Sequence, residues 1–110
     1  MKSFLVILEN KNPAGLENSL LIQHVQHLRK IHNSGNLVVC GPFADDSGAV
    51  LIIEAASQDK AEEIIQADPF IKEKYYGSYS ITEFYTANEA NQYLMDHDQT
   101  LGELKTAAEK

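Results

Sequence analysis

The sequence predicts an α+β fold in which four strands and two helices follow one another in the order β-α-β-β-α-β. Three observations predict it. Four short segments are rich in the β-branched and aromatic residues that favour strands. Between the first and second of them, and again between the third and fourth, apolar residues recur at helical spacing. The second and third are separated only by the turn-forming segment ADDSG, which is short enough for a hairpin.

Local signals set the bounds of each element. Strands are expected at residues 3–9, 36–43, 49–55 and 79–85. The first helix, residues 16–34, ends at Gly35, because glycine is a common residue just past a helix end. The second helix opens at Ser57, a preferred N-cap, and ends by Asp68, since a residue before proline is steered away from helical angles. A third helix is expected over residues 88–98, followed by a polar tail. The core order is that of a ferredoxin-like sandwich, an antiparallel sheet with two helices on one face.

Composition and charge limit the classes of partner. The 110 residues suffice for one domain core, and the formal net charge of −7 argues against nucleic acid and against an anionic membrane surface, which would repel the chain. The apolar stretches are too short to span a membrane or to act as a signal peptide. Cys40 is the single cysteine and has apolar neighbours, so we expect a buried thiol, no internal disulfide and a cytoplasmic location.

The first and third strands are apolar on both of their faces. Two helices can cover only one face of the sheet, so the other face needs a partner. A homodimer packed sheet against sheet is the simplest solution, with the C-terminal helix as a clasp.

Three of the four histidines lie in the first helix, and one of them interrupts its apolar stripe. At 100° per residue, His24 falls between Ile31 and Leu28 on the inward face. His27 falls at the edge of the stripe, and His32 lies at the helix end. His24 is therefore the histidine that faces the core.

Asp68 is the candidate partner of His24. It continues the inward face of the second helix, seven residues after Ala61. Both helices are expected on the same face of the sheet, which allows the two side chains to meet. A carboxylate bonded to one ring nitrogen fixes the tautomer and makes the other nitrogen a better base. The pattern thus allows a candidate acid–base pair.

Structural interpretations compete with this one. A single histidine on an apolar helix face is more often a core residue held by one hydrogen bond. An aspartate before a proline is often the N-cap of a short helix, here PFIKEK. His24 and His27 are three residues apart, but no third ligand completes a metal site, so no metal is expected. No cofactor is expected either, because the chain has no dinucleotide fingerprint and no phosphate-binding loop.

Several short motifs, taken in order, resemble the YciI-like (YCII-related) family. They are His24 eleven residues before Gly35, the segment GNLVVCGP, Gly48 before a strand, Ser57 opening the second helix, and ADPF with Asp68. The resemblance covers residues 3–85. Residues 1–86 are therefore expected to form the YciI-like domain, and residues 87–110 a C-terminal helical extension with a polar tail.

The resemblance implies a ferredoxin-like α+β fold that dimerises into a barrel, with an active site at the positions of His24 and Asp68. One branch of the family eliminates halide from a chlorinated hydroxyhydroquinone, so the implied chemistry is proton transfer on a cyclic or aromatic molecule. Two positions depart from the family. Leu21 stands where arginine is common, and Ala49 stands where many members have serine. If those two residues bind an anionic substrate in other members of the family, the ligand of this protein is expected to be less charged or to be held differently.

We therefore expect a cofactor-free isomerase or lyase that acts on a small molecule in a pocket between the helices and the sheet. His24 is expected to be the general base and Asp68 to orient it. Phe43, Phe70 and Tyr75 are candidate walls of the pocket. The alternative is a non-catalytic small-molecule-binding or interaction module in which the pair is structural.

Overall fold

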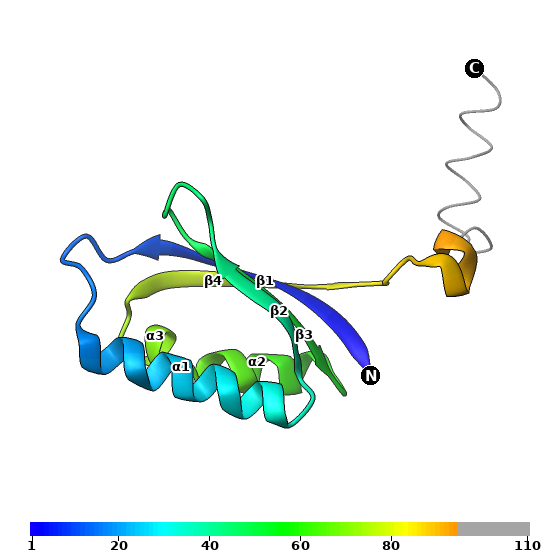
Figure 1. The fold of residues 1–110 in the computed structure, drawn as a ribbon, viewed down its shortest axis with the longest axis horizontal. Helices are drawn as coiled ribbons and strands as arrows, with labels where there is room; N and C mark the ends of the chain where they lie inside the picture. Colours follow the sequence, from blue (N-terminus) through cyan, green and yellow to red (C-terminus); the bar gives the residue numbers. More distant parts are fainter. Residues whose placement is uncertain (95–110) are drawn as a thin grey trace, which may run out of the picture.

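The computed structural model describes residues 1–94, and its elements follow the predicted order (Figure 1). The elements are β1 (Lys2–Lys11), α1 (Asn18–Asn33), β2 (Leu37–Pro42), β3 (Ala49–Ala55), α2 (Gln58–Gln66), α3 (Pro69–Lys72), β4 (Tyr76–Phe84) and a short 3-10 helix, η1 (Glu89–Leu94). The β-α-β-β-α-β order is confirmed, with the four-residue helix α3 added between α2 and β4.

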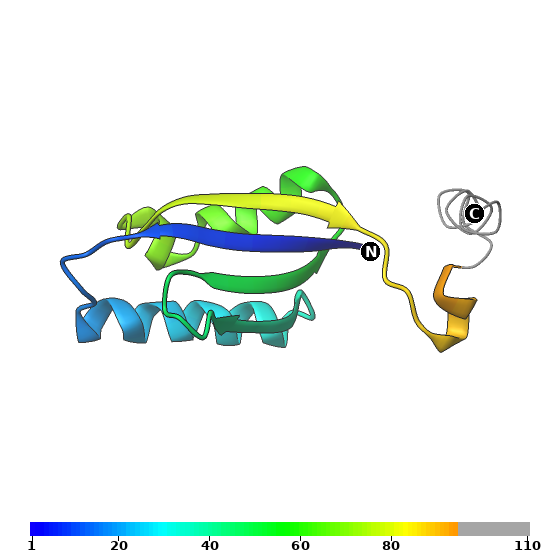
Figure 2. The same cartoon turned by 90° about the horizontal axis from the view of Figure 1, so that it is seen from above.

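The four strands form one antiparallel sheet in the order β2-β3-β1-β4. Helices α1, α2 and α3 all lie on the same side of this sheet (Figures 1 and 2). Side chains alternate along a strand, so β1 sends Phe4, Val6 and Leu8 into the core beneath the helices. On β3, Leu51 and Ile53 pair with Val6 and Phe4 and are buried with them. This two-layer core is the ferredoxin-like sandwich that the sequence predicts.

The other face of the sheet has no layer over it within residues 1–94 (Figure 1). Leu5 and Ile7 of β1 lie on this side, next to Val50 and Ile52 of β3. Val39 of β2 pairs with Ile52 and is 54% exposed. The two central strands are therefore apolar on both faces, as the sequence indicates.

The ends of α1 and α2 follow the expected signals within two residues. Ser57 caps α2, since its Oγ accepts a hydrogen bond from the backbone N–H of Lys60 at 3.2 Å. Gly35 has a φ of 83° just after α1, a conformation that glycine adopts without strain. Helix α1 begins at Asn18, two residues later than predicted, and the residue before it, Glu17, makes no side-chain cap. None of the helices in the described part of the chain has the length and apolarity to cross a membrane.

A regular helix was expected over residues 88–98, but the described part of this segment, which ends at Leu94, is not a regular α-helix. Asn88 caps the segment as predicted, its Oδ1 accepting from the backbone N–H of Asn91 at 3.1 Å. The turn that follows is a 3-10 helix interrupted at Asn91, Gln92 and Tyr93, and none of its side chains is buried. A segment with no apolar layer to pack against has little to hold a regular helix. Residues 95–98 and the tail lie outside the described residues.

Candidate active site

Helices α1 and α3 bring His24 and Asp68 into direct contact. The Nδ1 atom of His24 lies 2.8 Å from Oδ1 of Asp68, although 44 residues separate them in the chain. The His24 side chain is 14% exposed and that of Asp68 is 2% exposed. A carboxylate can only accept, so Nδ1 carries the ring proton and Nε2 is left as the acceptor of a neutral imidazole. The predicted contact is therefore present, whereas a catalytic role for it stays a prediction.

Asp68 also has a structural role in the local fold. Its Oδ1 accepts the backbone N–H of Phe70 at 2.9 Å, which makes Asp68 the N-cap of α3 with Pro69 at the first helical position. The same oxygen therefore serves both the helix cap and the imidazole. The capping interpretation and the pairing interpretation of ADPF hold together, because the cap fixes the carboxylate where His24 can reach it.

Phe70 holds the imidazole from the side. Its ring lies parallel to that of His24, with 3.7 Å between the centroids and 6° between the planes. Tyr76 packs edgewise on Phe70 and on Tyr75, and the ring of Tyr75 is tilted at 49° to that of Phe70. With Asp68 on one ring edge and Phe70 on one face, the orientation of His24 is well defined.

A cavity of about 400 Å³ lies between the helix layer and the sheet, within the size range of small-molecule sites. Its lining is mainly apolar, and His24, Cys40, Lys11 and Asp46 supply chemically distinct groups. Asp68 is not part of the lining and lies behind His24. Of the three aromatic residues predicted as walls, Phe70 and Tyr75 line the cavity and Phe43 does not. The ring of Phe43 instead lies against Gly48 at the base of the hairpin.

Two further titratable groups lie near the pair. Cys40 is partly buried and lines the cavity, and burial raises the pKa of its thiol, so the group is a neutral thiol rather than a nucleophilic thiolate. His27 is half-buried beside α2, its Nε2 is buried without a hydrogen-bond partner among the described residues, and burial lowers its pKa. Among residues 1–94, no group of three or more potential ligands is placed to hold a metal ion.

The chain matches the YCII-related domain over residues 3–85, which is most of its length. It belongs to the YCII-related family. A curated relative, the uncharacterized protein YjpA of Bacillus subtilis (strain 168), is 38% identical over 48 residues. That match covers 44% of this chain and 56% of the relative, so the chain spans little more than half of the relative's length.

A solved structure with a similar fold is 5-chloro-2-hydroxyhydroquinone dehydrochlorinase (TftG) from Burkholderia phenoliruptrix AC1100, in complex with 2,5-dihydroxybenzoquinone. The TM-score is 0.56 at 22% sequence identity, with 81% of this chain and 99% of that chain covered. This likeness confirms the α+β fold of the YCII-related chain.

The two departures from the family pattern both lie in the cavity wall. Leu21 and Ala49 each line it, one from α1 and one from the start of β3. An arginine and a serine at these positions would have given the cavity a cation and a hydroxyl. With leucine and alanine there, the cavity is more apolar than it would be with arginine and serine. Its polar groups come from other residues, among them His24, Lys11 and Asp46.

Proposed function

We propose that the protein is a cofactor-free enzyme that moves a proton on a small cyclic or aromatic substrate, with His24 as the general base. The observation that carries the proposal is the Asp68–His24 contact of 2.8 Å at the wall of a cavity of about 400 Å³. An oriented imidazole at the wall of a cavity that can hold a small molecule is the arrangement that proton abstraction requires.

In the proposed reaction, Nε2 of His24 takes a proton from a carbon or oxygen of the bound molecule. The imidazolium that forms is stabilised by the carboxylate of Asp68, which accepts the Nδ1–H throughout. In an isomerisation His24 returns the proton to a different atom of the conjugated system. In an elimination the electron pair of the broken C–H or O–H bond forms a new double bond, the leaving group departs as an anion with the electrons of its own bond, and His24 later releases the proton to water.

The substrate class rests on the cavity and on the fold neighbour. Phe70 and Tyr75 line the cavity and give its wall aromatic carbon against which a ring can pack. The fold neighbour TftG is named as a dehydrochlorinase of a chlorinated hydroxyhydroquinone and holds a dihydroxybenzoquinone. Isomerisation or elimination on a small ring is the reaction class that both observations support.

A binding or interaction module without catalysis is the second candidate. It is favoured by the cap that Asp68 provides to α3, because a carboxylate needed for folding would be retained without any reaction. The two candidates differ in what the loss of His24 does. In a binding module, loss of His24 leaves the ligand affinity unchanged, and neither the wild type nor the variant catalyses a reaction.

We also propose that two copies of the chain pack through the uncovered sheet face. That face carries Leu5, Ile7, Val39, Val50 and Ile52 in one continuous patch on three neighbouring strands. A second copy supplies a matching apolar sheet, and a two-fold axis makes the patch complementary to itself.

The catalytic proposal is tested with 3-cyclohexen-1-one, whose isomerisation to the conjugated 2-cyclohexen-1-one is followed by ultraviolet absorbance. Deuterium uptake from D2O into a panel of enolisable cyclic ketones extends the test to exchange without net reaction. The expected result is a rate that His24→Asn lowers at least a hundredfold, as for the loss of a general base. His32→Asn is the matched control, because His32 is exposed on the same helix. Wild-type rates equal to those of His24→Asn on every compound contradict catalysis by His24.

A further inference from the structure

Lys11 reaches the cavity because the end of β1 is irregular. Regular alternation from the inward-facing Leu8 would place Asn10 on the helix side and Lys11 on the uncovered face. Asn10 instead has a φ of 57°, and its Nδ2 donates to Ser78 Oγ at 2.6 Å. Gly77 allows the close approach, since a Cβ there would lie 3.2 Å from the Asn10 carbonyl oxygen. The left-handed conformation of Asn10 reverses the alternation of side chains, so that Lys11 lies on the helix side of the sheet and lines the cavity.

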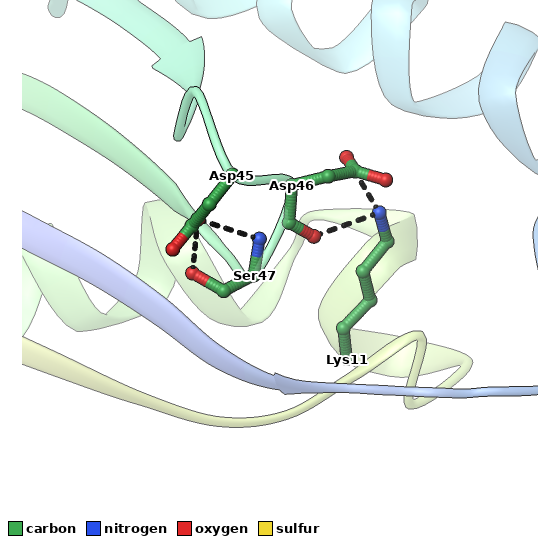
Figure 3. A network of polar contacts seen from close by, with 4 residues as sticks. All are labelled: Lys11, Asp45, Asp46 and Ser47. Carbon is green, nitrogen blue, oxygen red and sulfur yellow. Dashed lines mark hydrogen bonds and ion pairs between the residues drawn. The ribbon is translucent and has the colours of Figure 1, made fainter.

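The ammonium of Lys11 is held at the cavity by an acidic turn (Figure 3). Its Nζ lies 2.7 Å from Oδ1 of Asp46 and 3.2 Å from the Asp46 carbonyl oxygen. It also lies 5.7 Å from the ring centroid of Tyr75, within the range of a cation–π contact. The Asp46 carboxylate raises the pKa of Lys11, so the group is a cation at neutral pH.

The two partners of this ion pair differ in exposure. The Lys11 side chain is 23% exposed, whereas that of Asp46 is 79% exposed, in the turn between β2 and β3. Water and salt screen an exposed carboxylate, so its pairing adds little to stability and is readily exchanged.

The neighbouring Asp45 closes the turn independently of Asp46. Its Oδ1 accepts from the backbone N–H of Ser47 at 3.0 Å and from the Ser47 hydroxyl at 2.6 Å (Figure 3). The turn therefore has its own hydrogen bonds when the Asp46 carboxylate moves away from Lys11.

We propose that Lys11 is the anion-binding group of the cavity, and that it exchanges the Asp46 carboxylate for a negatively charged oxygen on a small ring compound. The proposal deepens the function proposed above, on which it rests for the identity of the site. It assigns the substrate class as a monoanion whose charged oxygen contacts Lys11 while its ring lies in the cavity near His24.

Charge and lining support this class of ligand. Lys11 is the single lysine or arginine among the described residues that line the cavity. The chain carries a formal net charge of −7, so an anion that enters the cavity needs a local cation to offset the repulsion. The remaining walls are largely apolar, with Leu8, Leu51 and Phe70 among them, which suits the carbon skeleton of a ring.

The test measures binding of benzoate and of its neutral isostere benzamide by calorimetry. The wild type is expected to bind benzoate more tightly than benzamide. Lys11→Gln should weaken benzoate at least tenfold and leave benzamide unchanged, the loss expected for a charge-assisted hydrogen bond. Lys11→Arg should retain the preference for benzoate. Asp46→Asn should tighten benzoate several-fold, because the competing carboxylate is gone.

Lys60→Gln is the matched control. It makes the same change in net charge, and Lys60 also has an acidic partner, Glu63 at 3.3 Å, but it lies on α2 away from the cavity lining. Circular dichroism and the melting temperature confirm that each variant is folded. The inference is wrong if the wild type does not prefer benzoate, if Lys11→Gln and Lys60→Gln weaken benzoate equally, or if Asp46→Asn weakens it.

Binding and turnover separate this inference from the proposed function. Benzoate affinity that depends on Lys11, in a protein whose His24→Asn variant isomerises ketones as fast as the wild type, rejects the catalytic proposal and retains the anion site. Benzoate affinity that does not depend on Lys11, in a protein whose His24→Asn variant isomerises ketones at least a hundredfold more slowly than the wild type, rejects the role of Lys11 and retains His24 as a base.

Discussion

Replacement of Asp68 separates its structural role from its chemical role. Both donors, Phe70 N–H and His24 Nδ1, are bound by the same Oδ1 atom. Asp68→Ala removes the N-cap of α3, which leaves the Phe70 N–H without its acceptor at a cost of about 1 kcal/mol, and it leaves the buried His24 Nδ1–H unpaired at a cost of about 1–3 kcal/mol. Because the Asp68 side chain is 2% exposed, water is a poor substitute, and the expected loss of unfolding free energy is about 2–4 kcal/mol.

Asp68→Asn should behave differently. Asparagine caps helices as well as aspartate does, and its amide oxygen can accept both hydrogen bonds in the same place. What is lost is the charge, which strengthens each bond by about 1 kcal/mol, so the expected destabilisation is about 1–2 kcal/mol. The rate should fall at least about tenfold, because the imidazolium formed in the reaction loses its counter-charge.

Urea unfolding followed by circular dichroism measures the stability of both variants, and the ketone assay measures the rate. Equal destabilisation by Asp68→Ala and Asp68→Asn would refute the assignment of both bonds to one acceptor oxygen. An Asp68→Asn enzyme with full activity would show that the charge has no part in the reaction.

Further predictions concern the fold, its pH dependence and its assembly. Gly48→Ala should lower the unfolding free energy by about 2 kcal/mol or more, because its Cβ would collide with the backbone carbonyl of Leu8, whereas Gly41→Ala, with open space around it, should have little effect in the same urea assay. Burial lowers the pKa of His27 below 6.5, so its contribution to stability is present above that pH and is lost as the pH falls through the lowered value. His27→Gln should therefore make the unfolding free energy less dependent on pH between about 7 and 5 than in the wild type, and an unchanged slope would contradict this. Ile7→Lys on the uncovered sheet face should convert a dimer into a monomer in light scattering, and a wild type that is already monomeric would rule out the proposed assembly.

The regular part of the fold could be predicted because its local signals agree with one another. Strand β3 occupies residues 49–55 as predicted, since its apolar run follows the turn segment ADDSG and ends just before Ser57, the cap of α2. Helical spacing allows His24 and Asp68 to meet, because both helices must pack on one face of the sheet, but spacing alone favours the structural interpretations, and the resemblance to the YCII-related family is what favours the pair. The stacking of Phe70 on His24 could not be predicted in the same way, as it depends on the exact turn that α3 makes after its cap.

Lys11 could not be assigned to the site from the sequence. The first strand was expected to end at Glu9, and even a longer strand would have placed Lys11 on the uncovered face by regular alternation. The left-handed residue Asn10 reverses that alternation, and a single such residue leaves no periodic signal. The irregular 3-10 turn at Glu89–Leu94 could not be predicted either, because a capping residue indicates where a helix begins but not whether anything packs against it.

The most direct measurement of the central claim is the tautomer of the His24 ring, read from long-range proton–nitrogen correlation spectra at a pH where the ring is neutral and assigned with His24→Asn. The account predicts a proton on Nδ1, held by Asp68, and an unprotonated Nε2 that is available to a substrate. A proton on Nε2 instead would leave the ring without its basic nitrogen toward the substrate, and would contradict the account.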